Sequence, residues 1–361
     1  RLAQPAFHKE RLAGMARVIV ALVEESLPRF DALAEAGEPF DLAAEVMRLV
    51  LAITGRVLFG ADLSGVAEDV ARAVTTLLEE INHQVLSVLP LPAFLPLPGH
   101  VRLRHAIQVL DRIVFGIIDA HHRQPGREED LLALLMAARD ADTGEGMSDR
   151  QLRDEVMTLL LAGHETTATA LAWTFHLLEQ NPEQEALLHE EVDRELGGRM
   201  PTLADLPRLR YTGCVFEEAM RLYPPIWALP RTPHEDDEVG GYRIPKGDIV
   251  VLVPYVTHRH PDFWPDPERF DPTRFLPEAS RQRPRWAYLP FGGGQRQCIG
   301  NHFAMMEAQF ILAMVAQRFR LRGVPGVPVL PEPLVTLRPK GPLPMHAQRR
   351  EGVARGGLAT A

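Results

Sequence analysis

The sequence predicts a mainly α-helical protein, a large helical domain with small β-sheets near its C-terminal half. Apolar residues recur at helical spacing through most of the first 223 positions, as Leu12, Met15, Val18 and Ile19 do near the start. From Ala228 onward, short β-like runs alternate with turns that contain proline and glycine. A chain of 361 residues, of which 46% are apolar, can bury a large core.

Helices fill the first part of the chain. Asp41 is expected to cap one that ends before Gly60. Pro28 is expected to kink or divide the first helix, because proline removes a backbone donor. The apolar, proline-broken run 89–98 is equally consistent with an exposed contact surface and with a loop packed on the core. Helical periodicity also predicts helices over 8–36, 66–88, 101–122 and 130–139.

The next helix is long and apolar but has a polar interruption. Ser148 is expected to cap it, and its body covers 150–179. The segment Ala162-Gly-His-Glu-Thr-Thr167 places glycine, a carboxylate and two hydroxyls in its middle, where helix propensity disfavours glycine and threonine. Such a local conflict is where function is expected. A solvent-facing polar turn is the alternative.

The remaining elements are shorter. Glu218 and Arg221 share one face of a helix and can form an ion pair, although most such pairs are surface decoration. The folded part is expected to be a single domain over 1–348, followed by a polar tail over 349–361. Helices are expected over 182–196, 211–223 and 302–319, and strands over 239–244, 248–253, 320–322, 334–337 and 343–348.

The stretch Phe291-Gly-Gly-Gly-Gln-Arg-Gln-Cys-Ile-Gly300 holds one of only two cysteines. Cys298 lies just before an expected amphipathic helix, whose free N–H groups and dipole favour a thiolate. The glycines let the backbone turn tightly and approach a large planar ligand. Zinc and iron–sulfur clusters need further ligands that this loop lacks, whereas heme iron takes one axial thiolate. A buried structural cysteine is the alternative.

Composition excludes several classes of protein. A formal charge of −9 argues against nucleic acid as a partner. Two cysteines cannot build a disulfide scaffold, and they fit a reducing, cytoplasmic setting. No apolar run is long enough to span a membrane, so no membrane anchor is visible, and no signal peptide is visible either.

The pattern Phe-x-x-Gly-x-Arg-x-Cys-x-Gly over 291–300 resembles the heme-thiolate signature of the cytochrome P-450 family. In the expected chain order, Ala162-Gly-x-Glu-Thr-Thr167 resembles the family's oxygen-activating motif, and Glu218-x-x-Arg221 its Glu-x-x-Arg motif. Leu229-Pro-Arg231 resembles a strand whose arginine meets a heme propionate. Pro267-Glu-Arg-Phe270 is similar to the segment whose arginine completes a buried Glu–Arg–Arg cluster, here Glu218, Arg221 and Arg269.

The resemblance implies the cytochrome P-450 fold and heme b (iron protoporphyrin IX) as cofactor. Gln4-Pro-Ala-Phe7 is similar to the end of the family's third long helix, so the N-terminal sheet strands and first helices of the fold are expected to be missing. Glu165 and Thr166 would form the catalytic proton relay, with Cys298 as the metal ligand. The implied cofactor-binding residues are Cys298, Arg296, Arg231, Phe291, Gly292, Gly300 and Ala162.

The implied activity is that of a monooxygenase, which inserts one atom of dioxygen into an apolar small molecule. The narrower expectation is a fatty-acid-like substrate. Electrons would come from a separate ferredoxin- or flavodoxin-type donor with its reductase. Arg281, Arg283 and Arg285 would dock it, or would simply form a solvated loop. Leu159, Ala162 and the run 226–229 are candidate pocket walls. The alternatives are a truncated, inactive heme-binding or apo protein and, less favoured because Glu165 and Thr166 are present, a peroxygenase.

Overall fold

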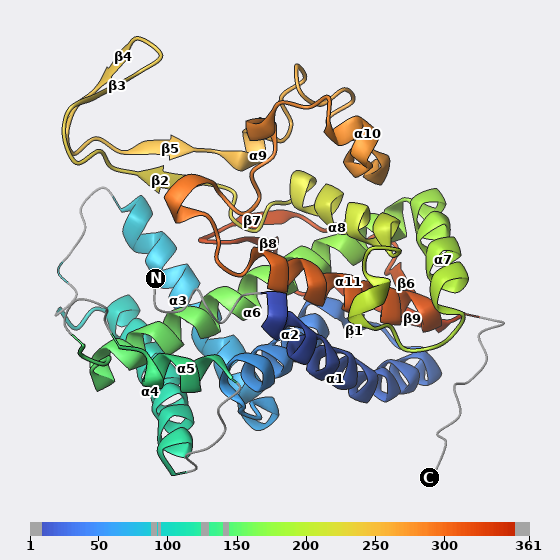
Figure 1. The fold of residues 1–361 in the computed structure, drawn as a ribbon, viewed down its shortest axis with the longest axis horizontal. Helices are drawn as coiled ribbons and strands as arrows, with labels where there is room; N and C mark the ends of the chain where they lie inside the picture. Colours follow the sequence, from blue (N-terminus) through green and yellow to red (C-terminus); the bar gives the residue numbers. More distant parts are fainter. Residues whose placement is uncertain (1–8, 88–91, 93–94, 124–129, 140–143, 351–361) are drawn as a thin grey trace.

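The computed structural model describes residues 9–87, 92, 95–123, 130–139 and 144–350. Long helices dominate it, and all the described strands but one follow the eighth helix (Figure 1). This arrangement confirms the predicted mainly α fold. The helices are α1 (Lys9–Ala36), α2 (Leu42–Phe59), α3 (Ala67–Leu86), α4 (Pro98–Arg123), α5 (Leu131–Ala137), α6 (Asp149–Gln180), α7 (Pro182–Leu196), α8 (Arg210–Leu222), α9 (Pro254–Thr257), α10 (Pro277–Ser280) and α11 (Asn301–Arg318).

The described strands form small antiparallel sheets. The three-stranded one has the order β1-β9-β6 and pairs Phe40 with Met345, so it joins segments far apart in the sequence. The others are the two-stranded sheets β2–β5, β3–β4 and β7–β8. The strands are β1 (Phe40–Asp41), β2 (Leu229–Arg231), β3 (Asp237–Val239), β4 (Tyr242–Ile244), β5 (Val250–Leu252), β6 (Phe319–Gly323), β7 (Pro331–Pro333), β8 (Leu337–Pro339) and β9 (Pro344–Arg349).

Local signals fix several helix ends as predicted. The Asp41 carboxylate accepts a hydrogen bond from the Ala43 N–H, and Gly60 ends α2 in the left-handed conformation. Ser148 and Gln151 form a reciprocal capping box at the start of α6. These caps matter because α2 and α6 carry the residues that surround the candidate site.

The prediction that Pro28 divides the first helix is wrong, because α1 continues through it. An interior proline costs about 3 kcal/mol or more. Val23, Leu27 and Phe30 are almost completely buried beside it, and each such side chain stabilises the fold by about 1.5–3 kcal/mol. Burial of the apolar stripe of α1 therefore outweighs the lost hydrogen bond.

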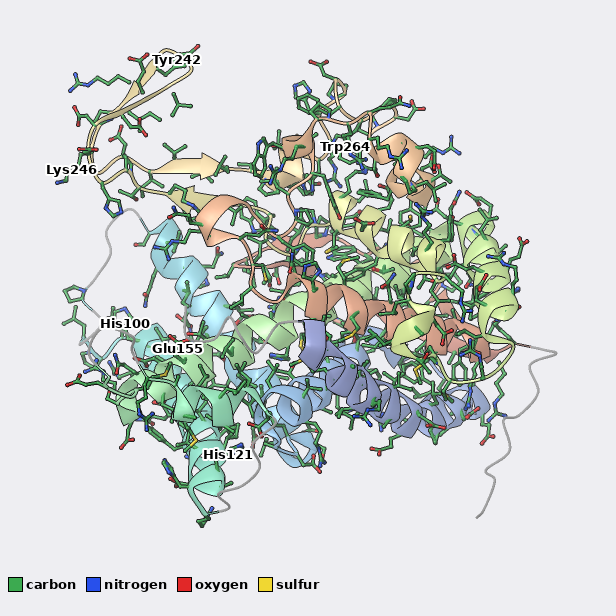
Figure 2. The ribbon with its side chains drawn as sticks, in the orientation of Figure 1. His100, His121, Glu155, Tyr242, Lys246 and Trp264 are labelled. Atoms are coloured by element: carbon green, nitrogen blue, oxygen red, sulfur yellow. The ribbon has the colours of Figure 1, made fainter. Side chains whose placement is uncertain are left out.

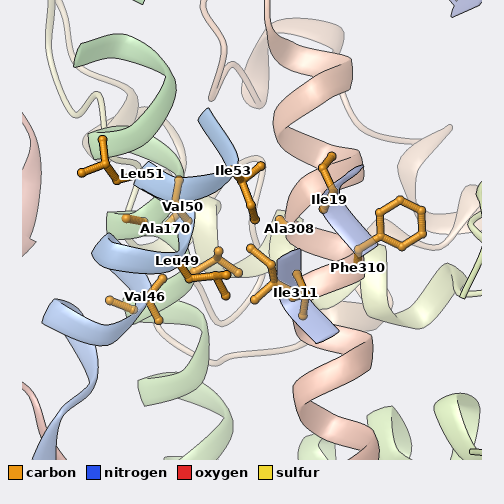
Figure 3. Packing of buried hydrophobic residues seen from close by; sticks show 14 of the residues in the cluster. Ile19, Val46, Leu49, Val50, Leu51, Ile53, Ala170, Ala308, Phe310 and Ile311 are labelled. Atoms are coloured by element: carbon orange, nitrogen blue, oxygen red, sulfur yellow. The ribbon is translucent and has the colours of Figure 1, made fainter. Parts of the chain in front are cut away.

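Helix α11 lies in the core rather than at its edge. The expected amphipathic pattern is wrong, because Phe310, Ile311, Leu312 and Ala313 are all buried in succession. Figure 3 shows side chains of α1, α2 and α6 gathered around it, with Ile53 between α2 and α11. The helix that follows the cysteine loop is therefore held from several sides.

Two parts of the chain lie at the surface, the β3–β4 hairpin and the last residues of β9. The β3–β4 hairpin projects from the body, and Tyr242 at its end is 79% exposed (Figure 2). At the C-terminus, β9 continues to Arg349, which forms ion pairs with Asp31 and Glu35. The polar tail predicted from 349 onward is therefore ordered at its start, and the rest of it lies outside the described residues, as does half of the run 89–98.

Candidate active site

The cysteine loop is built by tight backbone turns. Cys298 lies three residues before α11, and its N–H donates to the Phe291 carbonyl at 2.9 Å. Gly292 and Gly294 have φ values of 68° and 67°, which side chains other than glycine rarely adopt. These turns fold the loop back on itself, so that its first and last residues face the same space.

That space is a cavity of about 300 Å³, which we call the active-site cavity. Every site residue predicted from the sequence lines it except Glu165. The candidate walls Leu159, Ile226 and Leu229 line it as well, whereas the Trp227 indole is bonded to the Leu334 carbonyl instead. The predicted site residues that line the cavity are Ala162, Thr166, Arg231, Phe291, Gly292, Arg296, Cys298 and Gly300.

The electrostatics around Cys298 differ from the prediction. Desolvation raises the pKa of the Cys298 thiol although this side chain is exposed, and the Gly300 N–H lowers the pKa in part. A bound metal cation would supply the missing positive charge, because metals deprotonate the thiols that coordinate them.

The residues present fit heme. A thiol lies in an apolar cavity, and the glycine turns leave the floor of the cavity without bulky side chains. Arg231 and Arg296 line the same cavity, where their guanidinium groups can form charge-assisted hydrogen bonds with propionates. The set would thus supply one sulfur ligand for the iron, apolar walls for the ring and two cations for its carboxylates.

The polar side chains in the middle of α6 point in two directions. The Thr166 hydroxyl lies at the active-site cavity and donates to the Ala162 carbonyl at 2.7 Å. Glu165 faces away from it and accepts a hydrogen bond from the Thr336 hydroxyl at 3.1 Å. Burial raises the pKa of the Glu165 carboxyl. His164 is fully buried and its pKa is lowered to about 4, so it is a neutral packed residue.

The predicted ion cluster exists, but its third member is different. Glu218 and Arg221 are fully buried and 2.7 Å apart. The Arg274 guanidinium lies 3.5 Å from the Glu218 carboxylate, whereas Arg269 is exposed and contributes only its carbonyl to Arg221. The prediction of Arg269 is therefore wrong. The sequence contains a second Pro-x-Arg-Phe segment at 272–275, and only the structure distinguishes the two.

Sequence reasoning missed other residues of the site. Phe216 and Met220 of α8 line the active-site cavity, as do Phe303 and Ala304 of α11. Phe216 and Met220 are four residues apart, and Phe303 and Ala304 lie three and four residues after Gly300, so helical spacing was the signal that could have found them. Of the three arginines expected to dock a partner, Arg281 and Arg285 are exposed. The Arg283 guanidinium packs 4.2 Å from the ring centre of Trp264 and 4.6 Å from that of Phe275.

The model of the family described as Cytochrome P450 matches residues 1–344. The chain belongs to the cytochrome P450 family. It is therefore a heme-thiolate oxidoreductase of the monooxygenase type. A solved structure, the cytochrome P450DA heme domain, superposes with a TM-score of 0.85 at 28% identity, and the match covers 97% of this chain and 76% of that one. Within the described residues, no helix of this P450 is long and apolar enough to cross a membrane.

Curated relatives agree with this assignment. Cyclooctatin synthase of Streptomyces melanosporofaciens is 43% identical, over 97% of this chain and 76% of the relative. Cyclooctat-9-en-7-ol 5-monooxygenase of the same organism is 38% identical, over 97% and 75%. Pentalenene oxygenase of Streptomyces avermitilis is 34% identical, over 93% and 74%. None of these three names refers to a fatty acid, so they do not support the fatty-acid-like substrate suggested by the sequence.

Proposed function

We propose that this P450 holds heme b through Cys298 and inserts one atom of dioxygen into a C–H or C=C bond of an apolar small molecule. The observation that carries the proposal is the convergence of the Cys298 thiol, the Thr166 hydroxyl and two arginines on one cavity. When bound, heme supplies the redox chemistry that activates dioxygen.

The proposal assigns a role to each of the main residues of the candidate site. Cys298 would hold the heme iron through its sulfur, and the Gly300 N–H would stabilise the charge of the thiolate. Arg231 and Arg296 would bind the propionates by charge-assisted hydrogen bonds. The Thr166 hydroxyl is the proton donor at the place where dioxygen would bind. The Ala162 carbonyl orients this hydroxyl. Glu165 acts as the acid that resupplies this hydroxyl.

The walls of the cavity support an apolar substrate without a charged anchor. Leu159, Ala162, Ile226 and Leu229 are aliphatic, and the two arginines that line the cavity are assigned to the propionates. We propose a cyclic terpene-type hydrocarbon or alcohol, because cyclooctat-9-en-7-ol and pentalenene appear in the names of the relatives.

The proposed electron donor is a ferredoxin- or flavodoxin-type protein with its reductase, the kind of partner expected for a monooxygenase of the cytochrome P450 family. The buried Cys214 and the cavity-lining Cys298 are both free thiols, which supports a reducing, cytoplasmic location.

The first experiment is the spectrum of the reduced, carbon-monoxide-treated protein. The wild type should show the strongly red-shifted Soret band of a thiolate ligand. Cys298→Ser should lose that band because it removes the sulfur. Cys214→Ser is the matched control and should keep it, since Cys214 packs against Trp264 and Phe275, away from the cavity. A thiolate band that survives in Cys298→Ser would contradict the proposal.

Turnover separates this function from the alternatives. A monooxygenase requires reductant and dioxygen, whereas a peroxygenase forms product from peroxide alone. An inactive heme-binding protein would show the thiolate band but no product with any terpene tested. The presence of Thr166 in the cavity favours the monooxygenase, because its hydroxyl is placed for proton delivery.

A further inference from the structure

Gly293 in the cysteine loop is a glycine for a different reason than its two neighbours. Gly292 and Gly294 have φ values of 68° and 67°, whereas Gly293 has a φ of −163°, an extended backbone that any residue can adopt. A Cβ atom on Gly293 would instead lie 2.5 Å from Cζ3 and 3.0 Å from Cη2 of the Trp286 indole. The side chain of Trp286, and not the backbone, therefore leaves no room for a side chain here.

Trp286 is held against the loop although it is 55% exposed. The next residue, Ala287, is buried, and its carbonyl accepts a hydrogen bond from the Trp264 indole N–H at 3.3 Å. The Arg285 guanidinium lies 4.7 Å from the centre of the Trp286 ring. The indole thus covers the cysteine loop from the solvent side, on a backbone that is anchored in the core.

Two parts of the candidate site meet at Gly293. Two residues before it, the Phe291 carbonyl accepts the Cys298 N–H at 2.9 Å. Directly after it begins the short 3-10 helix Gly294–Arg296, whose last residue lines the active-site cavity. A contact that fixes Gly293 therefore fixes both the backbone hydrogen bond of Cys298 and the turn that carries Arg296.

We propose that Trp286 is a positioning residue of the active site, which holds Gly293 with its indole and thereby keeps Cys298 and Arg296 where heme would bind. This inference rests on the proposed function, because Cys298 is the proposed sulfur ligand. Trp286 acts through Gly293 by shape alone, since its ring fills the space that a side chain at position 293 would need.

Hydrogen exchange of the Cys298 backbone amide tests this role without turnover. The exchange rate reports how often the hydrogen bond to Phe291 opens. Trp286→Ala should speed the exchange about tenfold, which corresponds to about 1.4 kcal/mol. The control is the Ala304 amide, which donates to the Gly300 carbonyl at 2.9 Å and should keep its rate. Equal acceleration of both amides would mean a general loss of stability and would overturn the positioning role.

Two size-matched changes test the contact itself. Gly293→Ala adds the methyl group that meets the indole, so either the loop or the indole gives way, and the Cys298 amide should exchange faster, as in Trp286→Ala. Trp286→Phe removes Cζ3 and Cη2, and the Gly293→Ala methyl can take their place. In this double variant the exchange should return to within about twofold of the wild-type rate. Effects of the two changes that simply add would show that Trp286 does not act through Gly293.

Gly294→Ala is the matched control for this rescue. A Cβ atom on Gly294 has no described atom within 4 Å, but the φ of 67° strains any other residue there. Its effect on the Cys298 amide should therefore be the same with Trp286 or with Trp286→Phe. Rescue of Gly294→Ala as well would show that Trp286→Phe only loosens the loop, which contradicts the proposal.

The heme-loaded protein separates this inference from the proposed function. With carbon monoxide, Trp286→Ala should lose the thiolate band to that of a neutral thiol about tenfold faster than the wild type, because the bond that holds Cys298 opens more often. An equally persistent band in both proteins would overturn the role of Trp286 toward heme. If the wild type shows no thiolate band, the proposed function fails, and the exchange of the Cys298 amide still decides whether Trp286 positions the loop.

Discussion

For Thr166 and Glu165, the direction of the side chain determines which cavity each residue lines. They are adjacent in the sequence, yet Thr166 lines the active-site cavity and Glu165 lines a second cavity on another face of α6. Successive residues of a helix are turned by about 100°, so one helical step separates two environments. The Thr166 hydroxyl donates to the Ala162 carbonyl, whereas the Glu165 carboxylate accepts from the Thr336 hydroxyl.

Removing the Thr166 hydroxyl tests its part. Thr166→Ala should keep the heme-thiolate spectrum, because the change touches no proposed heme ligand. Product formed per electron should fall by roughly 100-fold, the lower end of what a positioned proton donor contributes, and the lost electrons should appear as peroxide. Thr174→Ala on the same helix should leave coupling unchanged. Equal coupling in both variants would remove Thr166 from the relay.

At the scale of an element, α8 links the core to the irregular segment before the cysteine loop. Arg221 is buried on this helix and donates to the carbonyls of His258, Pro267 and Arg269. Glu218 accepts from the Asp271 N–H as well as from Arg221. One ion pair on α8 therefore satisfies backbone groups of a segment with little regular structure of its own.

The two candidate arginines of this cluster make a matched pair of variants. Arg274→Met leaves the buried Glu218 carboxylate with fewer partners and should cost up to about 3–5 kcal/mol of unfolding free energy. Arg269→Met alters an exposed side chain and should stay within about 0.5 kcal/mol of the wild type. Urea unfolding of both variants checks this prediction. A larger loss in Arg269→Met would restore the assignment made from the sequence.

The cysteine loop could be predicted because its residue types and spacing are dictated by chemistry. Cys298 must be a lone sulfur, and Gly292 and Gly294 must adopt positive φ. The Arg274 assignment could not be predicted, since two Pro-x-Arg-Phe segments fit the same pattern locally. The direction of Glu165 was also hidden, because it depends on Thr336, which is 171 positions away in the sequence.

At the scale of the whole molecule, the central position of α11 has an electrostatic cost. Glu307 is fully buried on this helix, and neither of its carboxyl oxygens has a hydrogen-bond partner among the described residues. Burial raises the pKa of Glu307 well above its usual value of 4.5. The folded protein thus keeps this carboxyl neutral over a pH range in which the unfolded chain ionises it.

This difference predicts that Glu307→Gln raises the free energy of unfolding by an amount that depends on pH. Above pH 4.5 the unfolded wild type loses the proton that the folded state retains, so its stability falls as pH rises toward the folded-state pKa. The neutral variant has no such loss. The difference in unfolding free energy between variant and wild type should therefore grow by about 1.4 kcal/mol per pH unit. Urea unfolding at several pH values measures it, with exposed Glu190→Gln as control. A pH-independent difference would show that Glu307 ionises in the fold.

The pairing of β1 with β9 has a consequence for folding during synthesis on the ribosome. The Leu343 N–H donates to the Asp41 carboxylate across 302 positions of sequence. The strand that completes this sheet is therefore among the last described parts of the chain to be synthesised. Until it emerges, Phe40 and the neighbouring face of α1 lack their cover. Until then the nascent chain exposes this apolar surface to water, and such surface is prone to aggregate before folding is complete.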